Sequence, residues 1–193
     1  MSYMFYNCSS LKFINFSNIK ALSLIDVDNI FRHCNSLESI DLSYFDASLL
    51  TDLSYTFYKL YSLKAVNSSK LNIPSVKSMY SMFQNCTSLQ SIDFSNLDLS
   101  KVTSMHSMFR HCFSLKFINF SNVKASLLNN VYSIFDGCNS LESIDLSYFY
   151  VPSLAYLSDM SRLSSLKSIN LSYSNFSKIT SMYGVFFLYK LKK

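Results

Sequence analysis

Five cysteines are the residues of this chain with the greatest chemical potential, because thiolates bind metals and act as nucleophiles. They recur at intervals of 26 residues or a multiple of 26, at Cys8, Cys34, Cys86, Cys112 and Cys138. Paired zinc ligands lie only about two to four residues apart, so this spacing does not predict a metal site. Neighbouring turns would bring Cys8 near Cys34, so distance alone leaves disulfides open. Because Leu60 and Leu163 fill the same position in other repeats, we expect buried free thiols in a core slot.

Histidines and catalytic motifs give no stronger signal for chemistry. His33 and His111 share one repeat position but lie several turns apart, and His106 lies on the expected outer surface. We assign all three to ordinary surface or turn positions. The chain holds no G-x-S-x-G, H-E-x-x-H or glycine-rich phosphate loop. The sequence therefore predicts neither an enzyme nor a cofactor or metal site.

The elements that carry these residues follow from a 26-residue repeat. A phenylalanine recurs at Phe5, Phe31, Phe57, Phe83, Phe109 and Phe135, and a leucine six residues later begins the pattern L-x-x-[ILV]-x-[LF]. This pattern is typical of leucine-rich repeats. In residues 88–96 apolar and polar residues alternate, which predicts a strand. In residues 101–109 the apolar residues have helical spacing, which predicts a short helix, in part of the tighter i to i+3 kind.

The fold class that we expect is an α/β solenoid. About seven turns, each a strand plus a short helix, would form a right-handed leucine-rich repeat array with one parallel sheet roughly 34 Å across. The unbroken period predicts one domain over residues 1–193. Neither end supplies a polar cap, so we expect a fragment of a longer array, and the uncapped ends predict end-to-end self-association. Only the third repeat departs from the pattern, with Ser68 at an apolar position.

Composition excludes several classes of protein. Hydrophobic residues make up 49% of the chain, which suits a continuous core and argues against disorder. The net charge is +5, but Asp41, Asp93 and Asp145 interrupt the expected binding face, so we do not expect nucleic-acid binding. The apolar runs are too short to span a membrane, and residues 1–8 do not have the pattern of a signal peptide.

One face of the predicted sheet is free and is the candidate binding surface. Its middle column alternates between Asn and Asp: Asn15, Asp41, Asn67, Asp93, Asn119, Asp145 and Asn170. One interpretation is structural, with these side chains hydrogen-bonding to their neighbours along the stack. The alternative is a polar binding strip with aromatic anchors beside it, namely Phe13, Tyr44, Phe117, Tyr148 and Tyr173.

A longer repetition underlies the 26-residue one. The segment from Met4 to Ala21 recurs almost unchanged from Met108 to Ala125, which is 104 residues or four repeats later. Similar face residues would then lie roughly 19 Å apart. This arrangement favours extended or multivalent partners.

Aligned on its repeat, MF-x-x-C-x-SL-x-x-IDLS-x-F, nearly the whole chain resembles the BspA-like leucine-rich repeat surface proteins. The resemblance implies a cell-surface or secreted protein that binds proteins of a host or a neighbouring cell without catalysis. This chain has neither the signal peptide nor the wall or membrane anchor of a complete member of that family. We therefore carry two hypotheses forward: a protein-binding or adhesion module, and an intracellular scaffold or spacer without a dedicated ligand site.

Overall fold

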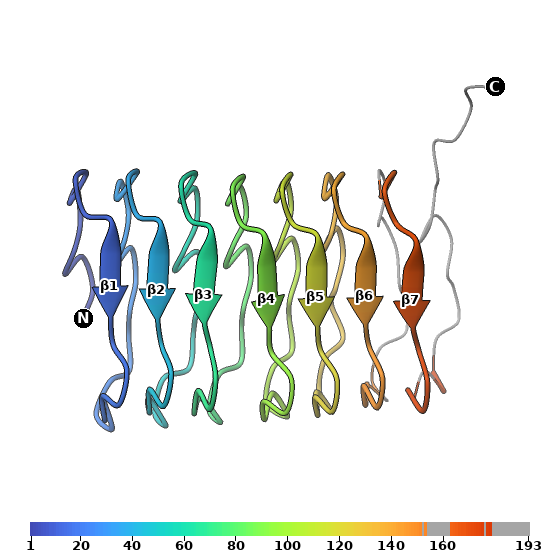
Figure 1. Cartoon of the computed structure of the whole chain (residues 1–193). Helices are drawn as coiled ribbons and strands as arrows, with labels where there is room; N and C mark the ends of the chain where they lie inside the picture. Colours follow the sequence, from blue (N-terminus) through green and yellow to red (C-terminus); the bar gives the residue numbers. More distant parts are fainter. Residues whose placement is uncertain (152, 154–162, 176, 179–193) are drawn as a thin grey trace.

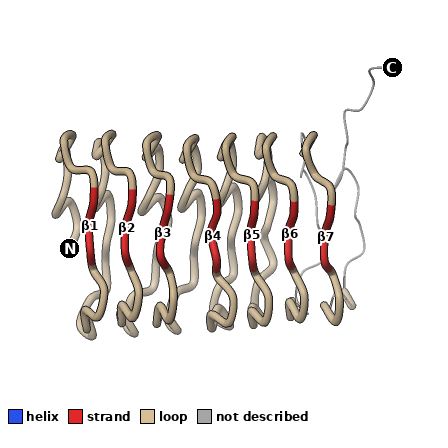
Figure 2. The backbone as a smooth tube through the Cα atoms, in the orientation of Figure 1, coloured by secondary structure: helices blue, strands red, loops and turns tan. Residues whose placement is uncertain are grey.

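The computed structural model describes residues 1–151, 153, 163–175 and 177–178. These residues form a parallel β-solenoid in which each turn contributes one short strand to the same side (Figures 1 and 2). The strands are β1 (Phe13–Asn15), β2 (Ser39–Asp41), β3 (Ala65–Asn67), β4 (Ser91–Asp93), β5 (Phe117–Asn119), β6 (Ser143–Asp145) and β7 (Ser168–Asn170). The residues near Met160, where the sequence shortens one repeat by a single position, lie outside the described residues.

The strands have the faces and register that the repeat predicts. Each has one central apolar residue turned inward, as Ile40 is in β2, between two residues that face outward. Paired residues are 26 positions apart, for example Phe13 with Ser39 and Asn15 with Asp41. The residues of each predicted column are therefore true neighbours across the strands.

The prediction of one continuous sheet needs a correction. Strands β1 to β3 form one ladder and β4 to β7 form another. Between them the strands stand further apart (Figure 1). At most junctions the N–H that follows a strand donates to the next strand, as Leu42 does to the Asn67 carbonyl at 2.8 Å. At the β3–β4 junction the hydroxyl of Ser68 donates to the Asp93 carbonyl instead.

The predicted helix was wrong, and no helix is found in the described part of the chain. In residues 101–109 alternate N–H groups bond to the next turn, as Met105 does to the Asn130 carbonyl at 2.8 Å. The N–H groups between them close single i to i+3 turns, as Met108 does to Met105 at 3.2 Å. A left-handed residue, Ser107 with φ 54°, then interrupts any helical run. Consecutive single turns place apolar residues three apart, so they imitate the spacing of a helix.

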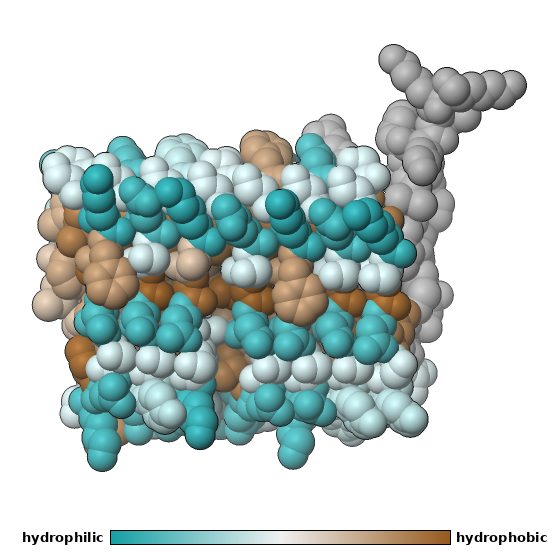
Figure 3. Space-filling model, in the orientation of Figure 1, coloured by the Kyte–Doolittle hydropathy of each residue, from teal (hydrophilic) through white to brown (hydrophobic). Residues whose placement is uncertain are grey.

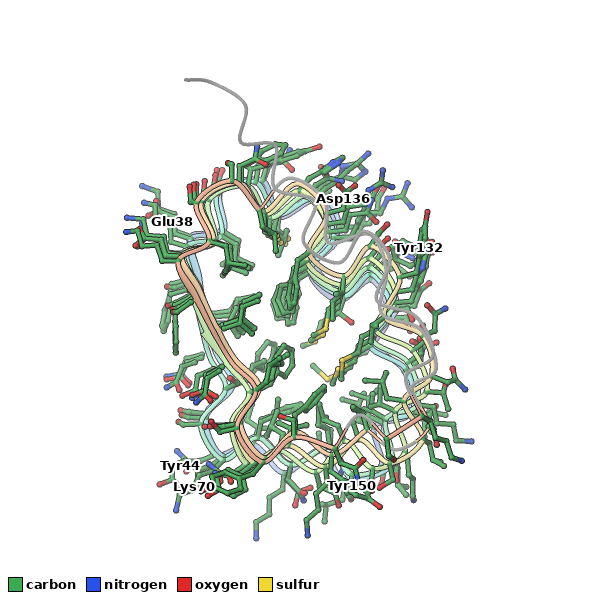
Figure 4. All side chains as sticks on the ribbon, turned by 90° about the vertical axis from the view of Figure 1, so that its right-hand side faces the viewer. Glu38, Tyr44, Lys70, Tyr132, Asp136 and Tyr150 are labelled. Atoms are coloured by element: carbon green, nitrogen blue, oxygen red, sulfur yellow. The ribbon has the colours of Figure 1, made fainter. Side chains whose placement is uncertain are left out.

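The core fills the coil from one end of the described turns to the other. The repeated phenylalanines stack along its axis, with ring centroids 5.0 Å apart for Phe57 and Phe83 and 5.5 Å apart for Phe83 and Phe109. Viewed along the axis, equivalent side chains of successive turns superimpose inside the coil (Figure 4). Each turn therefore buries its apolar residues mainly against the turns next to it, as expected for a solenoid.

Four of the five cysteines are buried as free thiols, as predicted, but Cys8 is exposed, so the prediction was wrong for that residue. The buried thiols have a specific role. Each donates a hydrogen bond to the carbonyl of a phenylalanine in the preceding turn, for example from Cys112 Sγ to the Phe83 oxygen at 3.1 Å. The equivalent bonds of Cys34, Cys86 and Cys138 are 2.9 to 3.1 Å long. Burial raises the pKa of the Cys112 thiol well above its usual range.

Candidate functional site

The outward face of the strands is a set of parallel rows, each made of one repeat position (Figure 3). We call this surface the sheet face. It contains the first and third residues of β1 to β7 and the residues that follow them at the ends of the strands. Most of these side chains are exposed or half-buried, including every predicted binding residue. The structure thus brings the twelve candidates onto one side of the coil.

The Asn and Asp column has a local structural function. The Oδ1 atom of Asp93 accepts the N–H of Ser95 at 2.8 Å, and Asn119 accepts that of Ser121 at 2.9 Å. The same bond to the residue two positions ahead forms at Asn15, Asp41, Asn67, Asp145 and Asn170. Each side chain therefore closes the bend after its own strand, an Asx turn. The structural interpretation was that these side chains hydrogen-bond to their neighbours along the stack, whereas the bond that recurs after all seven strands is made within the repeat.

Asp41 shows how the two kinds of bond compare. Its pKa is lowered first by the Ser43 N–H, then by the Ser43 hydroxyl, while the Asn67 side chain has a smaller effect. The carboxylate is thus stabilised mainly within its own turn. Each Asp has a second carboxylate oxygen beyond Oδ1 and each Asn has an amide NH2, so the column can still present both acceptors and donors to a partner.

Two phenylalanines interrupt the polar rows. Phe13 on β1 is 54% exposed and Phe117 on β5 is 40% exposed. They produce the two hydrophobic patches that stand out over β1 and β5 in Figure 3. Serine or alanine occupies the same position in the other strands, at Ser39, Ala65, Ser91, Ser143 and Ser168. The fold therefore does not require an aromatic side chain there.

The three predicted tyrosines, Tyr44, Tyr148 and Tyr173, lie at the bends that follow β2, β6 and β7. Tyr44 and Tyr148 are both 53% exposed, and Tyr148 stacks on Tyr173 with ring centroids 4.7 Å apart. All three have left-handed backbone, with φ of 56°, 54° and 59°. Asparagine tolerates this conformation better than tyrosine does, and it fills the position in other turns at Asn18, Asn96 and Asn122. The tyrosines are thus retained at some cost in backbone energy.

A charged row borders the sheet face along the start of the strands. It contains four lysines and two glutamates, with the uncharged Gln90 between the third and fourth charged residues: Lys12, Glu38, Lys64, Lys116, Glu142 and Lys167. Lys64 pairs with Glu38 and Lys167 with Glu142, each with a nitrogen to oxygen distance of 2.7 Å. Hydrogen bonding to Lys64 is the largest cause of a lowered pKa at Glu38. The two glutamates offset two of the four lysines and interrupt the row, so it does not form an unbroken basic stripe of the kind that nucleic-acid binding needs.

A cleft of about 700 Å³ divides the sheet face at the β3–β4 junction. We call it the front cleft. Asn67 and Asp93 line it from opposite sides, together with Lys70. The Lys70 ammonium also lies 5.6 Å from the centre of the Tyr44 ring (Figure 4). The front cleft thus has a mixed polar and apolar lining, and it lies among the predicted binding residues.

Reasoning from the sequence missed an aromatic row on the opposite wall of the coil. Tyr80, His106 and Tyr132 stack with ring centroids 5.1 and 5.3 Å apart, and Tyr55 meets Tyr80 edge to face. Burial, and then repulsion by Arg110, lowers the pKa of His106. Extending the comparison of repeat positions to Tyr80, His106 and Tyr132, each 26 residues apart, would have found this row.

In the described part of the chain, no group of three or more His, Cys, Asp or Glu side chains is placed to hold a metal ion. Nor does that part of the chain contain a helix long and apolar enough to cross a membrane.

Comparison with known proteins identifies a family but no individual relative. No curated protein and no solved structure gives a significant match. One family model matches residues 1–118 and again residues 89–191, which together cover nearly the whole chain. The overlap of the two matches agrees with a sequence built from repeats. The chain therefore belongs to the family described as "Mycoplasma protein of unknown function, DUF285".

Proposed function

We propose that this chain is a non-catalytic binding module whose sheet face attaches to a protein on the surface of a host or neighbouring cell. The observation that carries the proposal is the pair of exposed aromatics, Phe13 and Phe117, on a face where serine or alanine otherwise suffices. Exposed aromatic anchors within a polar surface are typical of the residues that dominate binding energy in protein interfaces.

The left-handed tyrosines support the same proposal. Tyr44 and Tyr148 occupy a position where asparagine would cost less backbone energy. Strain at an exposed aromatic residue is expected where the side chain is needed for contact. The resemblance to BspA-like leucine-rich repeat surface proteins adds support for a location at the cell surface.

The test uses substitutions that the repeat itself provides. Phe13→Ser and Phe117→Ser introduce the residue found in β2, β4 and β6, and Tyr44→Asn and Tyr148→Asn introduce that of Asn18, Asn96 and Asn122. We call the variant with all four changes the face variant. It should fold normally, because each new residue already occupies the same environment in another turn.

Binding of the fluorescently labelled chain to intact epithelial cells would be measured before and after trypsin treatment of the cells. The proposal predicts saturable binding that trypsin abolishes and that the face variant lacks. A matched control variant, with Leu49→Ser, Phe113→Asn and Leu127→Ser, removes exposed apolar side chains away from the sheet face and should bind normally. Trypsin-resistant binding, or equal binding by the face variant, would refute the proposal.

One observation favours the second candidate, a spacer without a ligand site. The Asn and Asp side chains of the sheet face are used for turns within their own repeats. Under that alternative neither the chain nor the face variant would show saturable binding to any of the cells.

A further inference from the structure

The back wall of the coil, which carries Tyr132 and Asp136 and lies opposite the sheet face (Figure 4), is held together by backbone bonds between turns. Between the third and fourth turns these run, for example, from Tyr55 N–H to the Tyr80 oxygen at 3.0 Å and from Lys59 N–H to the Gln84 oxygen at 2.9 Å. Equivalent bonds join the first turn to the second, the fourth to the fifth and the fifth to the sixth. Between the second and third turns, all of whose residues are described, none of them forms.

Leu60 explains where the wall opens. In the neighbouring turns a cysteine at this position donates its thiol hydrogen to the preceding phenylalanine carbonyl, as Cys86 does to Phe57 at 3.0 Å. The leucine side chain has no polar hydrogen, so the Phe31 carbonyl receives no hydrogen bond from Leu60. Leucine is also larger than cysteine. Contacts such as Tyr55 with Tyr80 then hold the third turn against the fourth.

The opening is a cleft of about 490 Å³ between the second and third turns. We call it the back cleft. Its volume falls in the range of small-molecule sites, roughly 300–1,000 Å³. Three tyrosines line it, namely Tyr55, Tyr58 and Tyr61, and Tyr55 and Tyr61 are more than 40% exposed. Aromatic side chains that line an open cleft suit a ligand with flat or ring-shaped apolar surfaces.

Polar groups in the back cleft restrict the ligand further. Arg32 and Lys59 line it, and neither forms an ion pair with a described residue. Asn29 and His33 also line it. Their N–H groups do not donate to a backbone carbonyl of the next turn, whereas the N–H groups at the same repeat positions in the third turn, Tyr55 and Lys59, do. The two basic side chains and the N–H groups of Asn29 and His33 can bind an anionic oxygen. Asp28, in turn, can accept hydrogen bonds from hydroxyl groups and would repel a multiply charged phosphate.

We propose that the back cleft binds a carbohydrate that carries a carboxylate, as a uronic acid does. The carboxylate lies against Arg32 and Lys59, the ring packs on the tyrosines, and the sugar hydroxyls bond to Asp28 and the nearby amides. This site is separate from the sheet face and from the function proposed for it, so the two can be tested independently.

The test compares three probes by calorimetric titration of the full chain. A hyaluronan tetrasaccharide supplies carboxylates on a neutral sugar framework. Chitotetraose in its fully N-acetylated form supplies a similar framework without charge, and inorganic phosphate supplies charge without a ring. We expect binding of hyaluronan at least about tenfold tighter than that of either control, and weaker in higher salt. Absence of hyaluronan binding at millimolar concentrations, or equal binding of chitotetraose, would overturn the proposal.

Two sets of variants assign the binding to the back cleft. Arg32→Gln with Lys59→Asn introduces the residues that the fourth turn has at these positions, Gln84 and Asn85, so the backbone should be preserved. This pair should weaken hyaluronan binding by about tenfold or more. Arg110→Gln, at the position equivalent to Arg32 in a closed part of the wall, should leave it unchanged. An unaffected Arg32 and Lys59 variant would contradict the assignment.

Leu60→Cys provides an independent measurement. The new thiol can donate to the Phe31 carbonyl, so it should draw the second and third turns together, slow hydrogen exchange of the Asn29 and His33 amides, and reduce hyaluronan binding. The face variant should bind hyaluronan as the natural chain does. Faster exchange of these amides in Leu60→Cys would contradict the explanation of the cleft.

Discussion

Single side chains in this coil form its bends and link its turns, and the bends are ones for which other folds often use glycine. The chain has only two glycines, and asparagine, serine, tyrosine and lysine residues adopt the left-handed bends instead. Asn and Asp side chains then close those bends through their Oδ1 atoms. Thiols link one turn to the next by donating to buried carbonyls. At the Asn and Asp column and at the buried cysteines, the type of residue is therefore determined by a hydrogen bond as well as by burial or exposure.

Thiol reactivity is the first prediction at this scale. Cys8 is exposed, whereas burial raises the pKa of the Cys86, Cys112 and Cys138 thiols and so suppresses their reactive thiolate forms. Native alkylation followed by mass spectrometry should show one rapid adduct, which Cys8→Ser abolishes. Rapid labelling at several sites would show that the buried thiols are not held as described.

His106 predicts a pH dependence. Its pKa is lowered from 6.5 by burial and by Arg110, so the unfolded chain binds the proton more tightly than the folded one. Stability is therefore lost as the pH falls below 6.5. His106→Tyr, which extends the stack of Tyr80 and Tyr132, removes this loss. Urea denaturation at pH 7.5 and 5.5 should show a larger decrease for the natural chain than for the variant, and equal decreases would count against the assignment.

At the level of whole turns, the third turn differs from the rest on both sides of the coil. Its backbone ladder to the fourth turn is interrupted on the sheet face, and its ladder to the second turn is missing on the back wall. Ser68 and Leu60, two departures from the repeat, lie at these two interruptions. The front cleft and the back cleft thus both border the third turn, which is irregular on both sides of the coil.

Ser68→Leu tests this account. Leu42 and Leu146 bury a leucine at the same position, and burying such a side chain contributes about 1.5–3 kcal/mol. Loss of the hydroxyl bond to Asp93 would cost about 0.5–1.5 kcal/mol. The free energy of unfolding should therefore rise by about 1 kcal/mol in a denaturation experiment. A fall of similar size would show that the Ser68 bond is what holds the two ladders together.

Over the whole molecule, the stacked turns convert the 26-residue pattern into two long surfaces, the sheet face and the back wall. The sheet face repeats its aromatic side chains over four turns, from Phe13 to Phe117, whereas the back wall carries stacked aromatics and the back cleft. A continuous core of stacked phenylalanines connects them. Such an array is suited to presenting several contacts at once to an extended partner.

The repeat period predicted the strands, their register and the composition of the sheet face, because parallel in-register turns put equal positions side by side. It could not separate a helix from consecutive single turns, since both place apolar residues such as Met105 and Met108 three apart. The repeat period also could not predict the front cleft or the back cleft. Ser68 was recognised as irregular, but the consequence of Leu60 depends on a thiol hydrogen bond that only the three-dimensional arrangement reveals.

The most direct test of the central claim, that the sheet face is the binding surface, is competition for trypsin-sensitive sites on epithelial cells. Labelled natural chain would be displaced by unlabelled natural chain, by the face variant or by the matched control variant. If the sheet face is the binding surface, the control variant competes as well as the natural chain, while the face variant needs at least about tenfold higher concentration. Equal competition by the face variant would contradict this claim.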